Sequence, residues 1–134
     1  ASGLSNVEFV GWVPARELPA VIEAADVCLG IFGRTEKAGR VVPHKILQSM
    51  GMRKAVITAR TAAAEEFFKH RENIFFCDGK LPESLAAAVL ELKNDADLRT
   101  RIARRGFEWV RENCSPKAIS RRLLEIVGKH FGKK

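Results

Sequence analysis

The pattern of apolar and polar positions divides the chain into short apolar runs separated by amphipathic segments. Residues 27–32, 55–58 and 74–77 are apolar without alternation, which is typical of strands buried on both faces of a parallel sheet. Residues 6–10, NVEFV, alternate and are rich in β-forming side chains, so they predict a strand that ends at Gly11. The pattern therefore predicts four strands.

Helices are predicted between these strands. The segment after Pro14 and the segment that begins at Pro43 each place their apolar residues on one helical face, and Gly51 is expected to end the second of these helices. Residues 60–64 are expected to form a loop, followed by a short helix over residues 65–69.

After Gly79 the pattern becomes continuously helical. One helix is predicted over residues 83–93, and Asp95 can cap the next. Ser115 and Pro116 form a cap and first-turn pair that opens a last helix. The apolar residues in register on this last helix, and expected on its inner face, are Ile119, Leu123, Ile126 and Val127.

Strands that alternate with helices indicate an α/β fold with an open parallel sheet and right-handed crossovers. We expect residues 1–134 to form a single partial domain that carries additional helices at its C-terminus. The predicted sheet is entered near its middle, and residues 1–4 resemble the end of a helix. We therefore expect the chain to be part of a larger protein whose sheet is completed on the N-terminal side.

Composition narrows the possible classes of protein. The sequence contains no apolar run of the roughly 20 residues that span a bilayer. The three cysteines are far apart and lack metal-binding spacing, so a reducing cytoplasm is the expected location.

A formal net charge of +7 is concentrated in residues 33–60 and 95–134. The second region could contact an anionic membrane surface or remain solvated, whereas few aromatics and no tyrosine argue against nucleic-acid binding.

The basic loop of residues 33–40 is the candidate binding element. It leaves an apolar strand and leads to Pro43, the preferred kind of residue for a helix start, where unpaired backbone N–H groups and a partial positive charge favour an anion. The cations around this point are Arg34, Lys37, Arg40 and Lys45. The pattern favours a site for the phosphates of a nucleotide, and an ordinary solvated loop is the alternative.

Three blocks of sequence resemble a known family: NVEFVGWVPARELPAVIEAADVCLGIF, VVPHKILQSMGMRKAVITA, and an acidic pair before RENIFFCDGKLPESLAAAVLELKND. In order and spacing they resemble the C-terminal, donor-binding half of family-4 (group 1) glycosyltransferases of the GT-B fold. The resemblance covers residues 6–127. It implies a Rossmann-like domain that binds a nucleoside-diphosphate sugar.

The resemblance also implies roles for individual residues. Lys45 would face the diphosphate and act in catalysis. The positions expected to contact the sugar and phosphate are Gly39, Arg40, Val41 and Val42. Many members carry two glutamates eight positions apart at the places of Arg40 and Gln48. Gln48 could still bind a ribose hydroxyl, whereas Arg40 reverses the charge near the sugar.

Three further positions have weaker assignments. Gly11 and Trp12 would lie near the nucleotide base, although for Trp12, as for Trp109, packing is the favoured role over stacking on a ligand. Glu65 would contact a donor hydroxyl, or it could simply complement the dipole of its own helix together with Glu66.

The implied function is transfer of a hexose, with retention, from a nucleoside-diphosphate sugar to a carbohydrate or lipid-linked acceptor that the missing N-terminal domain binds. No metal or other cofactor is expected, because basic groups and helix dipoles would stabilise the leaving diphosphate. The chain alone is expected to be inactive. The alternatives are a binding domain without activity and a GT-B-related nucleotide-sugar epimerase.

Overall fold

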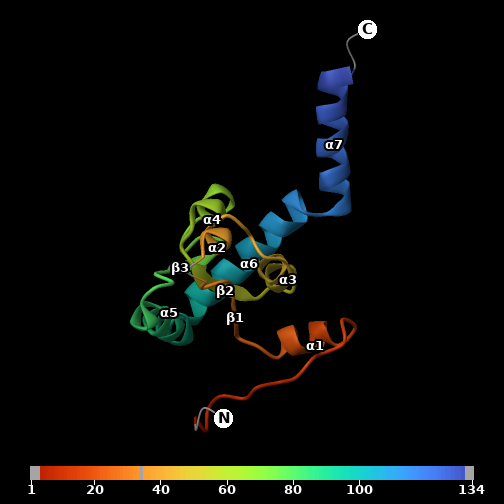
Figure 1. Cartoon of the computed structure of the whole chain (residues 1–134). Helices are drawn as coiled ribbons and strands as arrows, with labels where there is room; N and C mark the ends of the chain where they lie inside the picture. The colour runs from red at the N-terminus through yellow and green to blue at the C-terminus, as the bar shows by residue number, and fades with distance from the viewer. Residues whose placement is uncertain (1–3, 34, 132–134) are drawn as a thin grey trace.

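A computed structural model describes residues 4–33 and 35–131, so Arg34 lies outside the described residues. The chain forms an α/β domain (Figure 1). Its helices and strands, in order, are α1 (Leu18–Glu23), β1 (Val27–Leu29), α2 (Glu36–Gly39), α3 (His44–Gly51), β2 (Ala55–Ala59), α4 (Ala62–Phe67), β3 (Phe75–Cys77), α5 (Pro82–Asn94), α6 (Ala96–Asn113) and α7 (Pro116–Phe131).

The three strands form an open parallel sheet in the order β1-β2-β3, which confirms the predicted fold class. Val27 lies opposite Ala55, and Ile57 lies opposite Phe75. Hydrogen bonding continues beyond β1, because Gly30 N–H donates to the Ile57 carbonyl at 2.8 Å and Ala59 N–H donates to the Ile31 carbonyl at 3.1 Å. The apolar run of residues 27–32 therefore pairs along most of its predicted length.

Helices cover both faces of the sheet, which explains why its strands are apolar except for buried Thr58. On one face, Ala55 and Ile57 of β2 pack against α5 and α6 through Leu92 and Ile102. On the other face, Val56 packs in a cluster with α3 and α4. All five residues of β2 are buried, as expected for a central parallel strand.

The prediction of a strand over residues 6–10 is wrong. Residues 7–14 have no regular secondary structure, and the Phe9 and Val10 side chains are 82% and 65% exposed. Alternation alone does not make a strand, since its backbone groups must pair with a neighbouring strand. Among the described residues no strand pairs with this segment, which Figure 1 shows as an extended stretch running toward α1.

Several helix boundaries also differ from prediction. The basic loop contains α2, because the Thr35 hydroxyl accepts a hydrogen bond from Ala38 N–H at 3.2 Å and caps this helix. Likewise, α4 begins at Ala62 rather than near residue 65, because Thr61 caps it in the same way. Pro43 has extended backbone angles and precedes α3 instead of opening it. In both loops a threonine cap starts the helix earlier than its apolar pattern indicates.

The last helix forms as predicted, but its apolar face is not buried. Ser115 caps α7 through its hydroxyl, at 3.2 Å from Ala118 N, yet Ala118 is the buried residue of this helix. The expected inner residues Ile119, Leu123, Ile126 and Val127 are 42–59% exposed. Figure 1 shows why: α7 projects away from the sheet and its covering helices. Among the described residues, none of the helices has the length and apolarity needed to span a bilayer.

Candidate functional site

The carboxyl ends of the three parallel strands meet at one edge of the sheet, where open α/β sheets bind ligands. The segments after these strands pack tightly there. A Cβ atom added to Gly79 would lie 2.6 Å from the Ala59 Cβ, so only glycine fits where the chain leaves β3. Arg60 N–H donates to the Cys77 carbonyl at 2.9 Å and holds the segments after β2 and β3 together.

Helix α2 forms one wall of this edge and contains part of the predicted sugar and phosphate site. Arg40 forms an ion pair with Glu36, four residues earlier, and both side chains are largely exposed. The charge reversal expected at Arg40 is therefore offset by its neighbour. Gly39 lines a cavity at the strand ends together with Thr35.

The start of α3 presents an exposed cation. No side chain caps this helix, and its first turn contains no acidic residue. Lys45 is exposed in this turn beside exposed His44, at the end of the helix where unpaired backbone donors and the positive end of the dipole favour an anion. The preceding valines differ: Val42 packs against the core, whereas Val41 is 37% exposed.

Gln48 lies one turn after Lys45 and on the same side of α3, because residues three apart are neighbours on a helix surface. It lines a groove of about 250 Å³ between α1 and α3. Leu18, Ile22 and Met52 supply much of its apolar lining. The structure thus places the predicted ribose residue at the rim of an apolar groove, next to the predicted phosphate residue.

The structure does not bring Gly11 and Trp12 into this groove, whose lining begins at Ala15. Trp12 is 88% exposed, so the packing role considered for it is wrong. Trp109, in contrast, packs edge-on against Phe68 with ring centroids 4.7 Å apart, as expected. The two tryptophans differ because Trp109 lies on α6, which covers the sheet, whereas Trp12 precedes every described helix.

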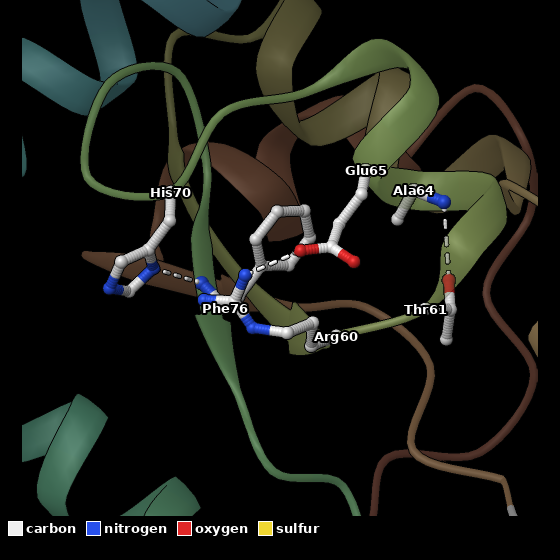
Figure 2. A network of polar contacts seen from close by, with 6 residues as sticks. All are labelled: Arg60, Thr61, Ala64, Glu65, His70 and Phe76. Carbon is white, nitrogen blue, oxygen red and sulfur yellow. Dashed lines mark hydrogen bonds and ion pairs between the residues drawn. The ribbon is translucent and has the colours of Figure 1, made fainter.

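Glu65 pairs with Arg60, as Figure 2 shows, with a separation of 2.5 Å between Arg60 Nη1 and Glu65 Oε1. The Arg60 guanidinium also lies over the Phe76 ring, 5.1 Å from its centroid. These contacts hold Arg60 at the carboxyl end of β2. Glu65 lies in the first turn of α4, so it also complements the dipole of that helix.

Sequence reasoning missed a set of polar residues at the same edge. Arg60 and Thr61 follow β2, and Asp78 and Lys80 follow β3. They line a cavity of about 210 Å³, and Arg60, Asp78 and Lys80 also line a second hollow of about 410 Å³. A signal was available, because polar residues that directly follow two buried parallel strands must lie near one another. A further hollow, lined by Glu72 and Trp109, includes residues that precede β3 and so lies toward the opposite edge.

His70 takes part in the fold and is not among the residues that line these two cavities. Its Nδ1 accepts a hydrogen bond from Phe76 N–H at 3.0 Å (Figure 2). Burial lowers the pKa of His70, the neighbouring Arg60 and Arg71 lower it further, and Glu91 partly opposes the change. The neutral ring therefore belongs to the folded state, because protonation at Nδ1 would remove the acceptor.

We expect stability to fall in mildly acidic solution because of His70. The unfolded chain takes up a proton at this residue near its usual pKa of about 6.5, whereas the folded chain does so only at lower pH. Unfolding therefore takes up protons in this window, and stability decreases as the pH falls from about 6.5 through the lowered folded pKa. Urea unfolding at several pH values should show a weaker pH dependence in His70→Gln. The same substitution at exposed His44 is the control, and equal pH dependence in wild type and His70→Gln would contradict the prediction.

The cysteines show no sign of reactivity at this edge. Cys28, Cys77 and Cys114 are free thiols. Burial, with a smaller contribution from Asp78, raises the pKa of Cys77, and burial raises that of Cys114, so both thiols stay protonated near neutral pH. Within residues 4–33 and 35–131, no group of three or more His, Cys, Asp or Glu side chains could hold a metal ion.

Comparison of the sequence with protein families and with curated proteins finds glycosyltransferases in both cases. The family model described as glycosyl transferase-like matches residues 2–125. The lipopolysaccharide core biosynthesis glycosyltransferase LpsE of Rhizobium meliloti is 29% identical over 122 residues, covering 91% of this chain and 34% of the relative. A GDP-mannose-dependent α-(1-6)-phosphatidylinositol monomannoside mannosyltransferase of Mycobacterium tuberculosis is 29% identical over 125 residues, covering 91% and 32%. The chain thus spans about a third of the length of these curated relatives.

Solved structures share the fold. The C-terminal domain of the group 1 glycosyl transferase LpcC from Francisella tularensis has a TM-score of 0.62 at 24% identity, covering 76% of this chain and 50% of that one. Sucrose-phosphate synthase from Thermosynechococcus elongatus has a TM-score of 0.77 at 18% identity, covering 95% and 31%. The family match spans more than half of the chain, and the fold agrees with it. The chain therefore belongs to the glycosyl transferase-like family.

Proposed function

We propose that this chain is the nucleotide-sugar-binding part of a retaining glycosyltransferase. The enzyme would transfer a hexose from a nucleoside-diphosphate sugar to a carbohydrate or lipid-linked acceptor. The family match supports glycosyl transfer in general. The observation that carries the more specific proposal is the arrangement of Lys45 and Gln48, one turn apart on the exposed side of α3 beside an apolar groove.

This arrangement suits the parts of a nucleotide-sugar in order. The apolar groove between α1 and α3 would take the nucleoside, whose ribose would meet Gln48 at the rim. The diphosphate would then reach Lys45 and the uncapped start of α3, where N–H donors and positive charge favour anions. Beyond it, the transferred sugar would lie near Gly39 and Val41, beside the cavity that Gly39 also lines at the carboxyl edge of the sheet.

The proposed chemistry places the main electrostatic demand on the leaving group. When the bond between the anomeric carbon and the phosphate oxygen breaks, its electron pair stays on the diphosphate. The growing negative charge would be stabilised by Lys45 and by the backbone donors at the start of α3. The acceptor hydroxyl supplies the oxygen of the new glycosidic bond. In this proposal, basic groups perform the charge stabilisation that a divalent ion performs in other transferases.

Binding of the acceptor would involve more of the protein than this chain. Because the chain spans about a third of its curated relatives, we propose that a separate N-terminal domain binds the acceptor. The mycobacterial relative is named for a phosphatidylinositol-linked substrate, so a lipid-linked acceptor fits the proposal. Free thiols at all three cysteines fit a cytoplasmic location.

Peripheral contact with an anionic membrane is also part of the proposal. Helix α7 carries exposed Leu123 and Leu124 together with Arg121 and Arg122, the combination of apolar and basic residues found in helices that lie on membranes. Cosedimentation with vesicles of anionic lipid, against vesicles of neutral lipid, measures this contact. Equal recovery in the supernatant with both would exclude it.

We expect Gln48→Ala to weaken binding of a nucleoside diphosphate by about 1–2 kcal/mol, because a hydrogen bond to a ribose hydroxyl is lost. The 2′-deoxynucleotide, which lacks one of these hydroxyls, should lose less. Calorimetric titration of the full-length protein with both nucleotides measures the difference. Equal losses for the two ligands would remove Gln48 from the ribose site.

Turnover separates the proposed transferase from its alternatives. A transferase consumes the nucleotide-sugar only when a glycosyl acceptor is supplied, whereas an epimerase converts it without one. A binding domain without activity would bind the nucleotide and leave the sugar unchanged. Product analysis with and without acceptor in the full-length protein therefore tests the enzymatic part of the proposal.

A further inference from the structure

The polar cavity at the ends of β2 and β3 is distinct from the surface of Lys45 and Gln48. Thr35 and Gly39 of the α2 region line one side of it, and Arg60, Asp78 and Lys80 line the other. Neither Lys45 nor Gln48 contributes to the lining. The cavity therefore shares no lining residue with the groove beside Gln48.

The walls of the cavity are held in place by contacts outside it. Arg60 is fixed by Glu65 at 2.5 Å and by the face of Phe76. Asp78 is fixed at both ends: its N–H donates to the Ser84 hydroxyl at 2.9 Å, and its Oδ1 accepts from Lys80 N–H at 2.8 Å. Side chains held in this way lose little conformational entropy when a ligand binds.

The charges of the cavity are mixed rather than uniformly positive. The Arg60 cation is balanced by Glu65, and Lys80 lies in the same lining as the Asp78 carboxylate. Such a surface offers both donors and acceptors at short range without a strong net field. Asp78 would repel a phosphate. Neighbouring hydroxyl groups of a ligand, each of which both donates and accepts hydrogen bonds, match the donors and acceptors of the lining.

The size of the cavity restricts the ligand further. Its volume of about 210 Å³ is below the roughly 300–1,000 Å³ of sites for drug-sized ligands, so it suits one sugar ring better than a whole nucleotide-sugar. Arg60, Asp78 and Lys80 also line the hollow of about 410 Å³. The same three side chains could therefore contact a saccharide of more than one ring.

We propose that this cavity is a second saccharide subsite, which binds a neutral sugar that carries no nucleotide. Resting on the function proposed above, the inference assigns the subsite to a sugar unit of the acceptor, beyond the donor sugar. Asp78 accepts hydrogen bonds from neighbouring hydroxyls, and Arg60 and Thr61 donate to them. The donor-binding part of the enzyme would thus contribute directly to the choice of acceptor.

The inference is tested by titrating the 134-residue chain, labelled with ¹⁵N, with methyl glycosides of mannose, glucose and galactose. At millimolar concentrations we expect at least one glycoside to shift the amide resonances of residues 60–61 and 78–80. Asp78→Asn should weaken this binding about tenfold, because the amide keeps the oxygen that accepts from Lys80 N–H but loses the carboxylate charge. Glu83→Gln, at the exposed start of α5, is the matched control and should bind like wild type.

The outcomes separate this subsite from the donor site. Shifts confined to residues 41–48, or no shifts with any glycoside, would overturn the inference while leaving nucleotide binding by the full-length protein unaffected. Equal affinity of wild type and Asp78→Asn would also overturn it. Conversely, glycoside binding that persists in a protein unable to bind nucleotide would support the subsite and contradict the proposed donor function.

Discussion

Replacing Lys45 with alanine is expected to lower kcat of the full-length enzyme about 100-fold, which corresponds to about 2.7 kcal/mol of transition-state stabilisation. In the proposed reaction, the negative charge of the diphosphate grows as its bond to the sugar breaks. A cation at the start of α3 would therefore bind the transition state more strongly than the bound substrate. No side chain caps this helix and its first turn has no acidic residue, so Lys45 is the cation of that turn best placed for the role.

The measurement combines turnover with thermal unfolding. Lys45 is exposed, so its removal should change stability little, and the loss should appear in kcat. Lys45→Arg should recover only part of the rate, because a planar guanidinium does not reproduce a compact ammonium. Lys69→Ala, at an exposed lysine after α4, is the control and should retain wild-type turnover. Near-normal kcat in Lys45→Ala would place the phosphate site elsewhere.

Replacing Gly30 with alanine is expected to lower the free energy of unfolding by about 3 kcal/mol. A Cβ at this position would lie 2.4 Å from Thr58 Oγ1 and 2.5 Å from Thr58 Cβ. Thr58 is fully buried, and its hydroxyl both accepts from Ile31 N–H at 3.1 Å and donates to the Ile31 carbonyl at 3.3 Å. The clash combines overpacking of a central strand with loss of these hydrogen bonds.

The control for Gly30→Ala is the same substitution at Gly51, the last residue of α3. A Cβ at Gly51 meets nothing within 4 Å, so stability should be unchanged or rise by up to about 1 kcal/mol through better helix propensity. Urea unfolding followed by circular dichroism measures both. Equal stability of the two variants would show that the segment after β1 can move away from Thr58, against the tight packing described here.

The sequence alone determined the fold class and most of the elements. Apolar runs without alternation identified the three paired strands, because a parallel strand covered on both faces exposes almost no side chain. The polar residue of β2, Thr58, is buried with its hydroxyl bonded to the backbone of Ile31. Asp95 and Ser115 marked helix starts correctly, since a cap depends only on residues three positions apart. Gly51 marked the end of α3. These features are local, and local chemistry is sufficient to specify them.

Tertiary structure decided what depends on distant partners. Residues 6–10 have the pattern of a strand but no neighbouring strand among the described residues, and α7 has an apolar face that its neighbours do not cover.

The arrangement of the candidate site also depends on tertiary structure. The sequence placed Lys45 and Gln48 on one helix, but it did not show the apolar groove that α1 completes beside them. It also could not show that Arg60 and Asp78 share a cavity, because the parallel pairing of β2 with β3 brings their ends together. Charge on a chain can be counted, but its neutralisation by Glu36 and Glu65 depends on where the folded backbone places each carboxylate.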